Sequence, residues 1–431
     1  MTQDLSYSDA VACDNDLGDR NSDRTQRNND LKTPADNSGK QMMETLENQS
    51  DLANTQDKCT NSVAVVAENQ PAQTEDLETE PVLSREVFST IEGFELIRDF
   101  WSGLNVDLMN SFAWNLWWWK SFQSLGDLHL LTFKQAGELV GIAPFYVDRW
   151  FGLKRFRFIA SGKACTDYVD LICDPKHYER CASSLSEYIC EQKFDVVELE
   201  CPNEDHLVTS IGPTLESVYD FDHRDVEPTW LMELPSEWKE FLSSRRSSLR
   251  RKINKAVRRL KAGEFVITST SEGVPMESAL ATLKDLHTRR MVSTGKPGVF
   301  ADPQFEEFLN NVVMEKAAAG EIEIIVASTD DGPVGVQLYF DTSRGYQFYQ
   351  SGYAPEAMKL EPGHLLFTEM VKRAIRRGDT RFDFLRGNEP YKEFWEAKPH
   401  GQKKLRMVSK RLIPRAIAKA IETSRRLVRG G

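Results

Sequence analysis

Hydrophobic residues recur with two periods along the chain, and these periods predict strands and helices in mixed order. In the first half, a turn at 135–137 separates apolar runs at 128–133 and 138–147, a pattern typical of a hairpin. Aromatic residues between 112 and 122 recur every three or four positions and predict one helix face packed into a core. The other elements expected there are a helix at 93–101, strands at 155–159, 168–172 and 195–200, and a helix at 177–192.

The second half shows a similar order of elements more clearly. Asp331-Gly332 lies between two apolar runs and predicts a hairpin turn. The expected elements are strands at 321–328, 333–340 and 346–353, a helix at 363–377, and strands at 381–385 and 403–409. Because a helix connects the strand at 346–353 with the strand at 381–385, these two strands must run parallel.

The two halves also share a short sequence pattern. Residues 140–146 align with residues 334–340, and each segment follows a turn that contains glycine. Together with the matching order of elements, this favours two similar α/β domains in tandem, at 83–234 and 235–412. One irregular α/β domain is the alternative.

Net charge separates the N-terminal segment from the rest of the chain. The 431 residues carry a formal charge of −12, of which residues 1–82 contribute −11 and the remainder −1. Residues 1–82 hold a single aromatic residue, Tyr7, and are rich in polar side chains, so they predict a disordered acidic tail. The nearly neutral remainder argues against a generally basic nucleic-acid binder, and no DNA partner is expected.

Several features of the chain indicate a cytoplasmic protein. No stretch approaches the roughly 18–20 apolar residues of a membrane-spanning helix, and the N-terminus lacks the pattern of a secretory signal. The seven cysteines are odd in number and form no C-x-x-C pair, so we expect reduced thiols. Histidines and cysteines lack the spacing of ligands, and no metal site is expected.

Two basic segments stand out. Residues 243–260 hold eight bases, no acid and an apolar stripe, which predicts a helix with one packed face and one positive face. The positive face either is only solvated or binds phosphates, an anionic polymer, tRNA or anionic lipid.

The second basic segment is at the C-terminus, where residues 402–431 hold ten bases and one acid. A basic amphipathic helix is expected at 413–431, with Ile417, Ile421 and Val428 on its apolar face. Through 415–429 it either attaches the protein weakly to an anionic membrane, at the inner face, or packs on the protein body.

Two places in the second half are candidates for ligand binding. A helix start can bind phosphate through its free N–H groups, and the helix expected at 363–377 begins with a Pro-Gly pair. The residues considered there are Lys359, Pro362, Gly363, His364 and Leu365. A Pro-Gly helix start without a ligand is the alternative.

The second place is the loop after the strand at 381–385, because ligands of open α/β sheets bind beyond the carboxyl ends of strands. The polar residues placed there are Arg386, Asn388, Tyr391 and Lys392. Asp383, on the strand itself, is either a functional carboxylate or the partner of a nearby arginine.

Further groups of residues follow in a characteristic order. They are Leu286-His287-x-x-Arg290 with Gly295 and Phe300, Gly335, Pro362-Gly363-x-Leu365-Leu366, and Asp383-Phe384-x-x-Gly387 with Tyr391-Lys392-x-x-Trp395. With the arginine-rich segment and the order of strands, they resemble the GNAT acetyltransferases of the cellulose-biosynthesis (CelD-like) group, relatives of the FemAB-type transferases. The resemblance covers about residues 85–412, although only Gly363 remains of the glycines in the usual GNAT phosphate loop.

The resemblance implies a fold, a reaction and a set of roles. The fold is α/β (α+β), with tandem GNAT-like domains that each hold a mixed, mostly antiparallel sheet flanked by helices. The reaction is N-acylation with acetyl-CoA or another acyl-CoA as co-substrate, no permanently bound cofactor, and an amine of a sugar or of an envelope or exopolysaccharide precursor as acceptor. The alternatives are an aminoacyl-tRNA donor, as in the FemAB relatives, or a non-catalytic protein that binds an anionic polymer or a membrane surface.

Each candidate residue then has an expected role. Tyr391 is the expected acid at the leaving thiolate, and Asp383 or His287 is the expected base. Lys359, Pro362, Gly363, His364 and Leu365 are expected to bind CoA, and Arg290, Arg386, Asn388 and Lys392 the substrates.

Overall fold

Alternating apolar positions in the first half form the predicted hairpin and the strands near 155–159 and 195–200, whereas of the strand expected at 168–172 only the end is extended, and the computed structural model describes residues 83–202 and 204–429. The strands of the first half are β1 (Leu83–Phe88), β2 (Asp127–Gln135), β3 (Glu138–Trp150), β4 (Leu153–Phe158), β5 (Ile172–Cys173) and β6 (Val196–Glu200). The helices are α1 (Glu92–Gly103), α2 (Phe112–Phe122), α3 (Tyr178–Gln192) and α4 (Thr209–Leu215). The predicted acidic tail at 1–82 lies outside the described residues.

The second half begins with two helices and continues with a sheet. Its helices are α5 (Trp238–Ser244), α6 (Ser247–Lys261), α7 (Met276–Ser293), α8 (Pro303–Ala317), α9 (Pro362–Arg377), α10 (Pro390–Phe394) and α11 (Leu412–Arg429). Its strands are β8 (Val266–Ser269), β9 (Ile322–Thr329), β10 (Gly332–Thr342), β11 (Gly345–Tyr353) and β12 (Arg381–Arg386). Helix α9 has a proline in its first turn and ends at Gly378, whose φ of +92° suits glycine.

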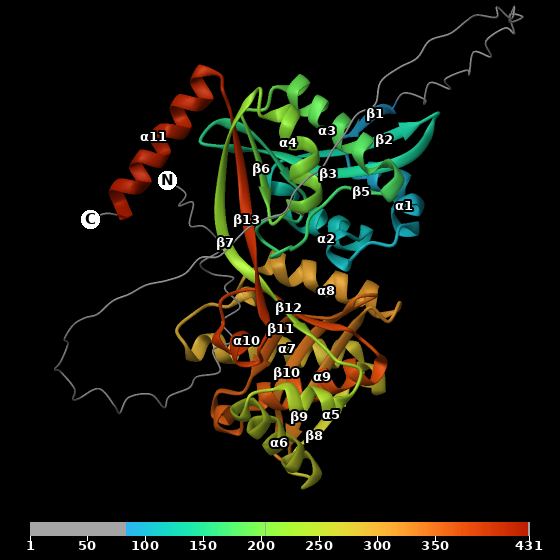
Figure 1. Ribbon diagram of the computed structural model, residues 1–431, viewed down its shortest axis with the longest axis vertical. Coiled ribbons are helices and arrows are strands. Elements are labelled where there is room, and N and C mark those ends of the chain that lie inside the picture. Colours follow the sequence, from blue (N-terminus) through green and yellow to red (C-terminus); the bar gives the residue numbers. More distant parts are fainter. Residues whose placement is uncertain (1–82, 203, 430–431) are drawn as a thin grey trace, which may run out of the picture. The chain divides into compact units, whose positions relative to one another are not determined.

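Two long strands join the halves into one sheet. They are β7 (Tyr219–Glu233) and β13 (Lys398–Ser409), which pair with each other in antiparallel fashion (Figure 1). On their outer sides, β13 pairs with β6 and β7 pairs with β12. The resulting 13-stranded sheet has the order β1-β2-β3-β4-β6-β13-β7-β12-β11-β10-β9-β8, with β5 paired to β3.

Each half repeats one arrangement, in which an antiparallel series of strands is followed by a helix and a parallel strand. The parallel pairs are β4 with β6 in the first half and β11 with β12 in the second. The predicted fold class is thereby confirmed, including the parallel strand after the crossover helix of the second half. The domain boundaries at 83–234 and 235–412 stay predictions.

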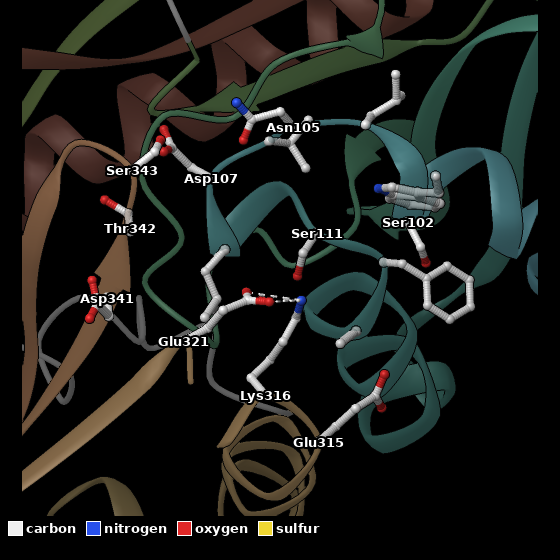
Figure 2. Close-up of a pocket in the computed structure, with 16 residues that line it drawn as sticks. Ser102, Asn105, Asp107, Ser111, Glu315, Lys316, Glu321, Asp341, Thr342 and Ser343 are labelled. Carbon is white, nitrogen blue, oxygen red and sulfur yellow. Dashed lines mark hydrogen bonds and ion pairs between the residues drawn. The ribbon is translucent and has the colours of Figure 1, made fainter. Parts of the chain in front are cut away.

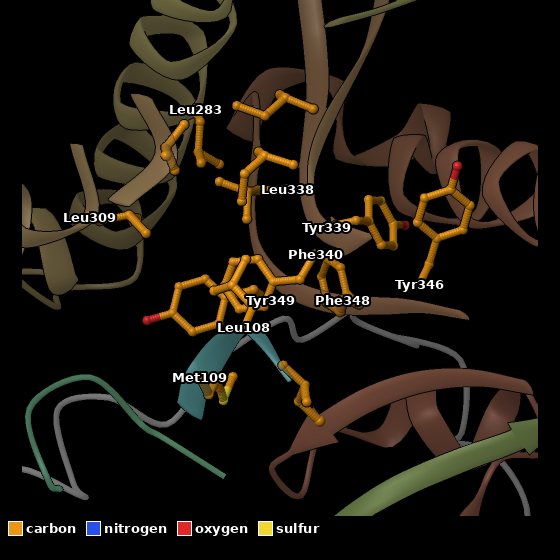
Figure 3. Close-up of a cluster of buried hydrophobic side chains, with 14 of the residues drawn as sticks. Leu108, Met109, Leu283, Leu309, Leu338, Tyr339, Phe340, Tyr346, Phe348 and Tyr349 are labelled. Atoms are coloured by element: carbon orange, nitrogen blue, oxygen red, sulfur yellow. The ribbon is translucent and has the colours of Figure 1, made fainter. Parts of the chain in front are cut away.

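The core of the second half extends to residues of the first half. Figure 3 shows Phe340 and Tyr349 of the sheet near Leu108 and Met109, which precede α2. Trp114 of α2 packs edge-on against the rings of Phe308, Phe340 and Tyr349 at centroid distances of 4.8–5.7 Å. The predicted aromatic helix is therefore a core element that the two halves share.

Helix α11 lies where the sequence predicts the basic C-terminal helix. Its residues Ile417 and Ile421 pack against a small cluster of Trp150, Leu153 and Val196. The apolar face expected to contact a membrane is thus turned, at these two positions, toward the protein body. Among the helices of the described part of the chain, none is long and apolar enough to cross a membrane.

Candidate active site

The buried carboxylate of Asp383 is the centre of the candidate site. Asp383 lies on β12 and is 6 % exposed. Its Oδ1 accepts a hydrogen bond from the N–H of Leu385 at 2.7 Å, and its Oδ2 accepts one from the hydroxyl of Tyr168 at 3.1 Å. Leu385 has a left-handed φ of +54°, a strained conformation that brings its N–H back to the carboxylate.

Burial makes Asp383 a weaker acid than an exposed aspartate. Desolvation raises the pKa of Asp383 to about 7, and the nearby Asp167 adds to this effect. Hydrogen bonds from Leu385 and Tyr168 and the charge of Lys392 oppose the rise in pKa. A carboxyl group with a pKa near 7 can take up and release a proton at neutral pH, as a general base must.

Gln347 is the residue of β11 directly opposite Asp383. The two strands run parallel and pair through these two residues, so both side chains leave the same face of the sheet. Gln347 is 6 % exposed, and its Oε1 has no hydrogen-bond partner among the described residues. A buried acceptor is normally satisfied, which suggests that a ligand donates to this one.

The first half reaches the site through the loop at 159–171. Asp167 accepts a hydrogen bond from the backbone N–H of Arg386 at 3.1 Å and forms an ion pair with its guanidinium at 3.1 Å. Arg386 also pairs with Glu200 at 3.3 Å. Arg386 therefore fixes the end of β12 to the first half, in addition to the role in substrate binding proposed from the sequence.

Lys392 binds the backbone of the loop after β12. Its ammonium group donates to the carbonyl oxygens of Leu385 at 3.1 Å and Arg386 at 2.7 Å, and it pairs with Glu389 at 3.0 Å. Gly387, with a φ of +140°, leaves room for these groups, because a Cβ there would lie 2.7 Å from the lysine nitrogen. Asn388, in the same loop, is exposed.

At the equivalent position in the first half, the carboxylate of Glu198 is surrounded by cations. Val197-Glu198-Leu199 on β6 corresponds to Phe382-Asp383-Phe384 on β12, since each strand follows a crossover helix and lies parallel to its neighbour. The partner of Glu198 across the strands is Arg157, in the place of Gln347. Four cations surround Glu198 within 3.5 Å: Arg155, Arg157, Lys404 and Arg406.

The pKa values of the two acids differ accordingly. Burial alone would raise the pKa of Glu198, but Arg157, Lys404 and the other two cations hold it well below its usual range. Asp383 has no ion pair among the described residues, and its pKa is raised. Of the two acids at this position, only that of the second half has a raised pKa.

Tyr391, the expected acid, lies on the opposite face of the sheet from Asp383. Its ring stacks on Phe367 of α9 at 5.3 Å and packs edge-on against Phe348 of β11 and Phe384 of β12. These contacts place Tyr391 over the junction of β11 and β12. Asp383 and Tyr391 thus flank the same strand junction from its two sides.

His287 and Arg290 on α7 lie further along β11. His287 Nδ1 donates to the carbonyl oxygen of Ser351 at 2.9 Å, and burial lowers the pKa of His287 to about 4. The guanidinium of Arg290 lies over the ring of Tyr353 at 5.2 Å. Both contacts are several residues beyond Gln347, so the structure does not bring His287 and Arg290 into the cluster around Asp383.

The residues expected to bind CoA surround the start of α9. Pro362, Gly363, His364 and Leu365 are buried, and Lys359 is exposed. The indole N–H of Trp395 donates to His364 Nδ1 at 3.2 Å, and burial lowers the pKa of His364 to about 4. Any contact of a phosphate with this helix turn would therefore be made through backbone N–H groups.

Helix α6 brings positive charge to the same helix start. The ammonium groups of Lys252 and Lys255 both pair with Glu361, the residue before α9, Lys255 at 3.0 Å. Burial alone would raise the pKa of Glu361, but hydrogen bonds from the two lysines lower it. A carboxylate thus occupies the place between two lysines and a helix start where a phosphate would be expected to bind.

A polar cavity of about 290 Å³ lies between the halves, and its lining does not include Asp383, Gln347 or Tyr168 (Figure 2). It is lined by the segment before α2, the end of α8 and the turn between β10 and β11, including Asp107, Glu321, Asp341 and Ser343. Leu108 lines the cavity, and Asn110, two residues on, donates to the carbonyl oxygen of Tyr168 at 2.9 Å. No cluster of possible metal ligands occurs in the described ranges 83–202 and 204–429.

Comparison with protein families identifies the second half. Residues 243–393 match the sequence model of the acetyltransferase (GNAT) domain family. Residues 243–393 therefore form a GNAT acetyltransferase domain, and the protein is an acyltransferase. None of the curated proteins matches the chain.

The chain shares its fold with FemX and has weaker similarity to other solved structures. FemX has a TM-score of 0.50 and 12 % identity, over 75 % of this chain and 96 % of FemX. L-PGS from Bacillus licheniformis has a TM-score of 0.45 and 12 % identity, over 80 % and 97 % of the two chains. A tandem GNAT protein from the clavulanic acid biosynthesis pathway has a TM-score of 0.40 and 10 % identity, over 76 % and 98 %.

Proposed function

We propose that the protein transfers an acyl group, preferably acetyl, from acyl-CoA to an amine of a sugar or of an envelope-polymer precursor. The observation that carries this proposal is the pair of Asp383 and Gln347 at the junction of β11 and β12, in a GNAT domain. Membership of the cellulose-biosynthesis (CelD-like) group is part of the proposal.

The proposed reaction is a direct transfer. The amine nitrogen attacks the thioester carbonyl carbon, the bond from that carbon to sulfur breaks, and an amide and a free thiol result. Asp383 takes the proton that the amine loses. Tyr391 supplies a proton to the thiolate, which requires the sulfur to lie between β11 and β12, where side chains of both faces can reach it. A strand N–H group polarises the thioester carbonyl.

We place the pyrophosphate of the donor at the start of α9. The N–H groups of its first turn and the lysines Lys252 and Lys255 would hold the phosphates, which would compete with Glu361 for the lysines. Lys359, which is exposed nearby, adds positive charge. A thermal-shift series with acetyl-CoA, CoA and longer acyl-CoAs tests this donor. The absence of any shift with all of them would reject it.

The sugar-like acceptor is proposed from the sequence resemblance. The polar cavity between the halves, whose lining does not include Asp383 or Gln347, is a second place that could receive part of this acceptor. Its volume of about 290 Å³ and its lining of carboxylate and hydroxyl groups suit a small molecule rich in hydroxyl groups. Turnover of glucosamine with acetyl-CoA, followed by thiol release, tests the acceptor class. A preference for amines without hydroxyl groups would argue against it.

An aminoacyl-tRNA donor is the alternative, and one surface favours it. Helix α6 exposes Arg250, Arg251, Lys255, Arg258 and Lys261. Such a face attracts phosphodiester chains. Binding of tRNA that weakens steeply with salt, together with no binding of acyl-CoA, would replace the first proposal with this one.

We also propose a weak contact with an anionic membrane through α11. Ile417 and Ile421 are packed on the body, but Leu412, Ile413 and Leu427 are 87 %, 71 % and 75 % exposed. Helical spacing places Leu412 and Leu427 away from the packed face, with Lys419 beside Leu412. Apolar residues next to a cation are suited to the surface of an anionic bilayer. In this proposal the enzyme works in the cytoplasm, at the inner face of the membrane.

A further inference from the structure

We propose that the acceptor amine is held between Gln347 and Asp383, and that Tyr168 of the first half positions Asp383 for it. This inference rests on the proposed N-acyltransferase activity and names the residues that would receive the amine. It makes the first half a part of the active site, although that half has no equivalent free acid of its own.

The geometry suits the hydrogen-bonding capacity of an amine. A neutral primary amine has two N–H donors and one lone pair, and the reaction needs the lone pair free. Gln347 Oε1, buried and without a partner among the described residues, accepts one N–H. Asp383 accepts the other, which leaves the lone pair for the thioester carbon.

Asp383 has acceptor capacity left for this contact. A carboxylate offers about four lone-pair positions, and the described contacts use one from Leu385 N–H and one from Tyr168 OH. When the amine attacks the thioester, its second proton passes to Asp383. The amide keeps one N–H, which stays on Gln347 until the product leaves.

Tyr168 has the features of a positioning residue. Its hydroxyl donates to Asp383 Oδ2 at 3.1 Å, and its carbonyl oxygen accepts from the side chain of Asn110 at 2.9 Å. Its backbone has a left-handed φ of +59°, which is uncommon for an aromatic residue. The two contacts fix the phenol ring between the halves and orient the carboxylate.

The first half supplies a second anchor through Asp167. The ion pair of Asp167 with Arg386 holds β12 three residues after Asp383. The ionisable groups that act on Asp383 are Tyr168 and Asp167, from the loop at 159–171, and Lys392. Asp167 pairs in turn with Arg386, Arg386 with Glu200, and Lys392 with Glu389.

The role of Tyr168 is tested by Tyr168→Phe, with Tyr178→Phe as a matched control. The hydroxyl of Tyr178 also donates to an aspartate of the first half, Asp170, outside the site. A hydrogen bond to the ionised form lowers a pKa, so its loss should raise the pKa of Asp383 in Tyr168→Phe. We expect an upward shift of about 0.5–1 unit in Tyr168→Phe and none in Tyr178→Phe.

This titration is measured by carbon NMR of the labelled aspartates, assigned with Asp383→Asn, and needs neither donor nor acceptor. The acidic limb of the pH–rate profile should move by the same amount. An unchanged Asp383 titration in Tyr168→Phe, or an equal shift in the control, would overturn the role of Tyr168.

The role of Gln347 is tested by Gln347→Met, which keeps the volume but removes the acceptor oxygen. We expect KM for glucosamine to rise at least tenfold, while calorimetry gives a Kd for acetyl-CoA within twofold of the parent. An unchanged KM, or an equal loss of donor affinity, would overturn the proposed amine site. A parent protein that neither binds nor turns over acetyl-CoA would instead reject the proposed function, and the NMR titration would still decide the role of Tyr168.

Discussion

At the scale of single residues, Glu198 and Asp383 hold equivalent positions but have opposite surroundings. Glu198 is ionised because four cations surround it, while Asp383 shares its strand junction with the neutral Gln347. A buried carboxylate without a cation costs folding free energy whenever it is ionised. Such a cost is expected at a catalytic base, because the same desolvation makes the group basic enough to take a proton.

Asp383→Asn should therefore lower the activity and raise the stability of the protein. We expect kcat to fall by about 10²–10⁴-fold, since the general base is lost. The folded pKa of about 7 lies above the usual 3.8, so the stabilising effect of the protonated acid is complete below about pH 4 and disappears as the pH rises to 7. Above pH 7 the asparagine variant should be more stable than the parent, by on the order of 1–4 kcal/mol.

Activity assays and thermal melts from pH 4 to 9 check this prediction. Asp170→Asn, in the same half as Tyr168 but outside the site, serves as the control. An Asp383→Asn variant that retains more than a third of the parental kcat would exclude Asp383 as the base.

At the scale of elements, the start of α9 combines a helix N-terminus with two lysines. Both lysines already form ion pairs with the carboxylate of Glu361. Glu361 neutralises Lys252 and Lys255 while no phosphate is bound. If the donor pyrophosphate takes the place of this carboxylate, Glu361 and the donor compete for the same cations. The affinity for the donor is then set by the residue before the helix as well as by the helix.

Two variants should change donor affinity in opposite directions. Gly363→Glu adds bulk and negative charge at the helix start and should weaken acetyl-CoA binding at least tenfold. Glu361→Gln frees both lysines and should strengthen binding about two- to tenfold, in line with the value of a charge near a helix N-terminus. Calorimetry measures both affinities, with circular dichroism to verify folding. If both variants bound acetyl-CoA with the parental affinity, the donor pyrophosphate would not lie at the start of α9.

Helix α11 allows a separate prediction about the membrane. Replacing Leu412, Ile413 and Leu427 with serine should abolish co-sedimentation with anionic liposomes at low salt, because these side chains are exposed large apolar groups of the helix. Leu96→Ser, at another leucine that is 74 % exposed, is the matched control and should bind as the parent does. Attachment should also weaken as salt rises, since salt screens the charges. Equal recovery of all three proteins in the supernatant would contradict this prediction.

The sequence predicted elements well where one periodicity extends over a whole element. The hairpins, α3, α9 and β12 follow from runs of apolar residues bounded by glycine or a turn. Strand β7 was not predicted, because charged residues interrupt its apolar positions and its pairing comes from β12 and β13, which are distant in sequence. The expected strand at 168–172 was wrong except at its end, since Tyr168 has a left-handed backbone and only Ile172–Cys173 is extended in a strand.

The site was predictable only in part for the same reason. Asp383 was found from the family resemblance of the strand at 381–385 and the loop after it, and the start of α9 from its Pro-Gly pair. Tyr168 lies 215 positions from Asp383 in sequence, and no local pattern indicates that contact. Gln347 did leave a signal, as a polar residue in a strand that is buried along its whole length.

At the scale of the whole molecule, the ion-pair cluster around Glu198 joins the halves. Its cations come from β4 of the first half and from β13, which the chain reaches only after completing the second half. Removing one member of a buried ion pair typically costs about 3–5 kcal/mol, because the remaining charges lose their partner. This cluster should therefore contribute to the stability of the whole sheet.

Glu198→Gln should accordingly destabilise the protein by about 3–5 kcal/mol at pH 7. The folded pKa of Glu198 is depressed, so its contribution is present above the unfolded value of about 4.5 and is lost as the pH falls. The difference in melting temperature between parent and variant should thus narrow below about pH 4.5. A constant difference between pH 7 and pH 3 would show that the charge of Glu198 is not responsible.

The place of β13 in the sheet has a consequence for synthesis of the protein. This strand lies between β6 and β7, yet about 200 residues are translated between β6 and the end of β13. At roughly 5–20 residues per second, the first half waits about 10–40 s on the ribosome with the edge of β6 uncovered. During that interval the nascent chain stays soluble only if chaperones bind it or if its aggregation is slow. We therefore expect a chain that ends before residue 398 to aggregate more readily than the full chain, because the edges of β6 and β7 stay unpaired.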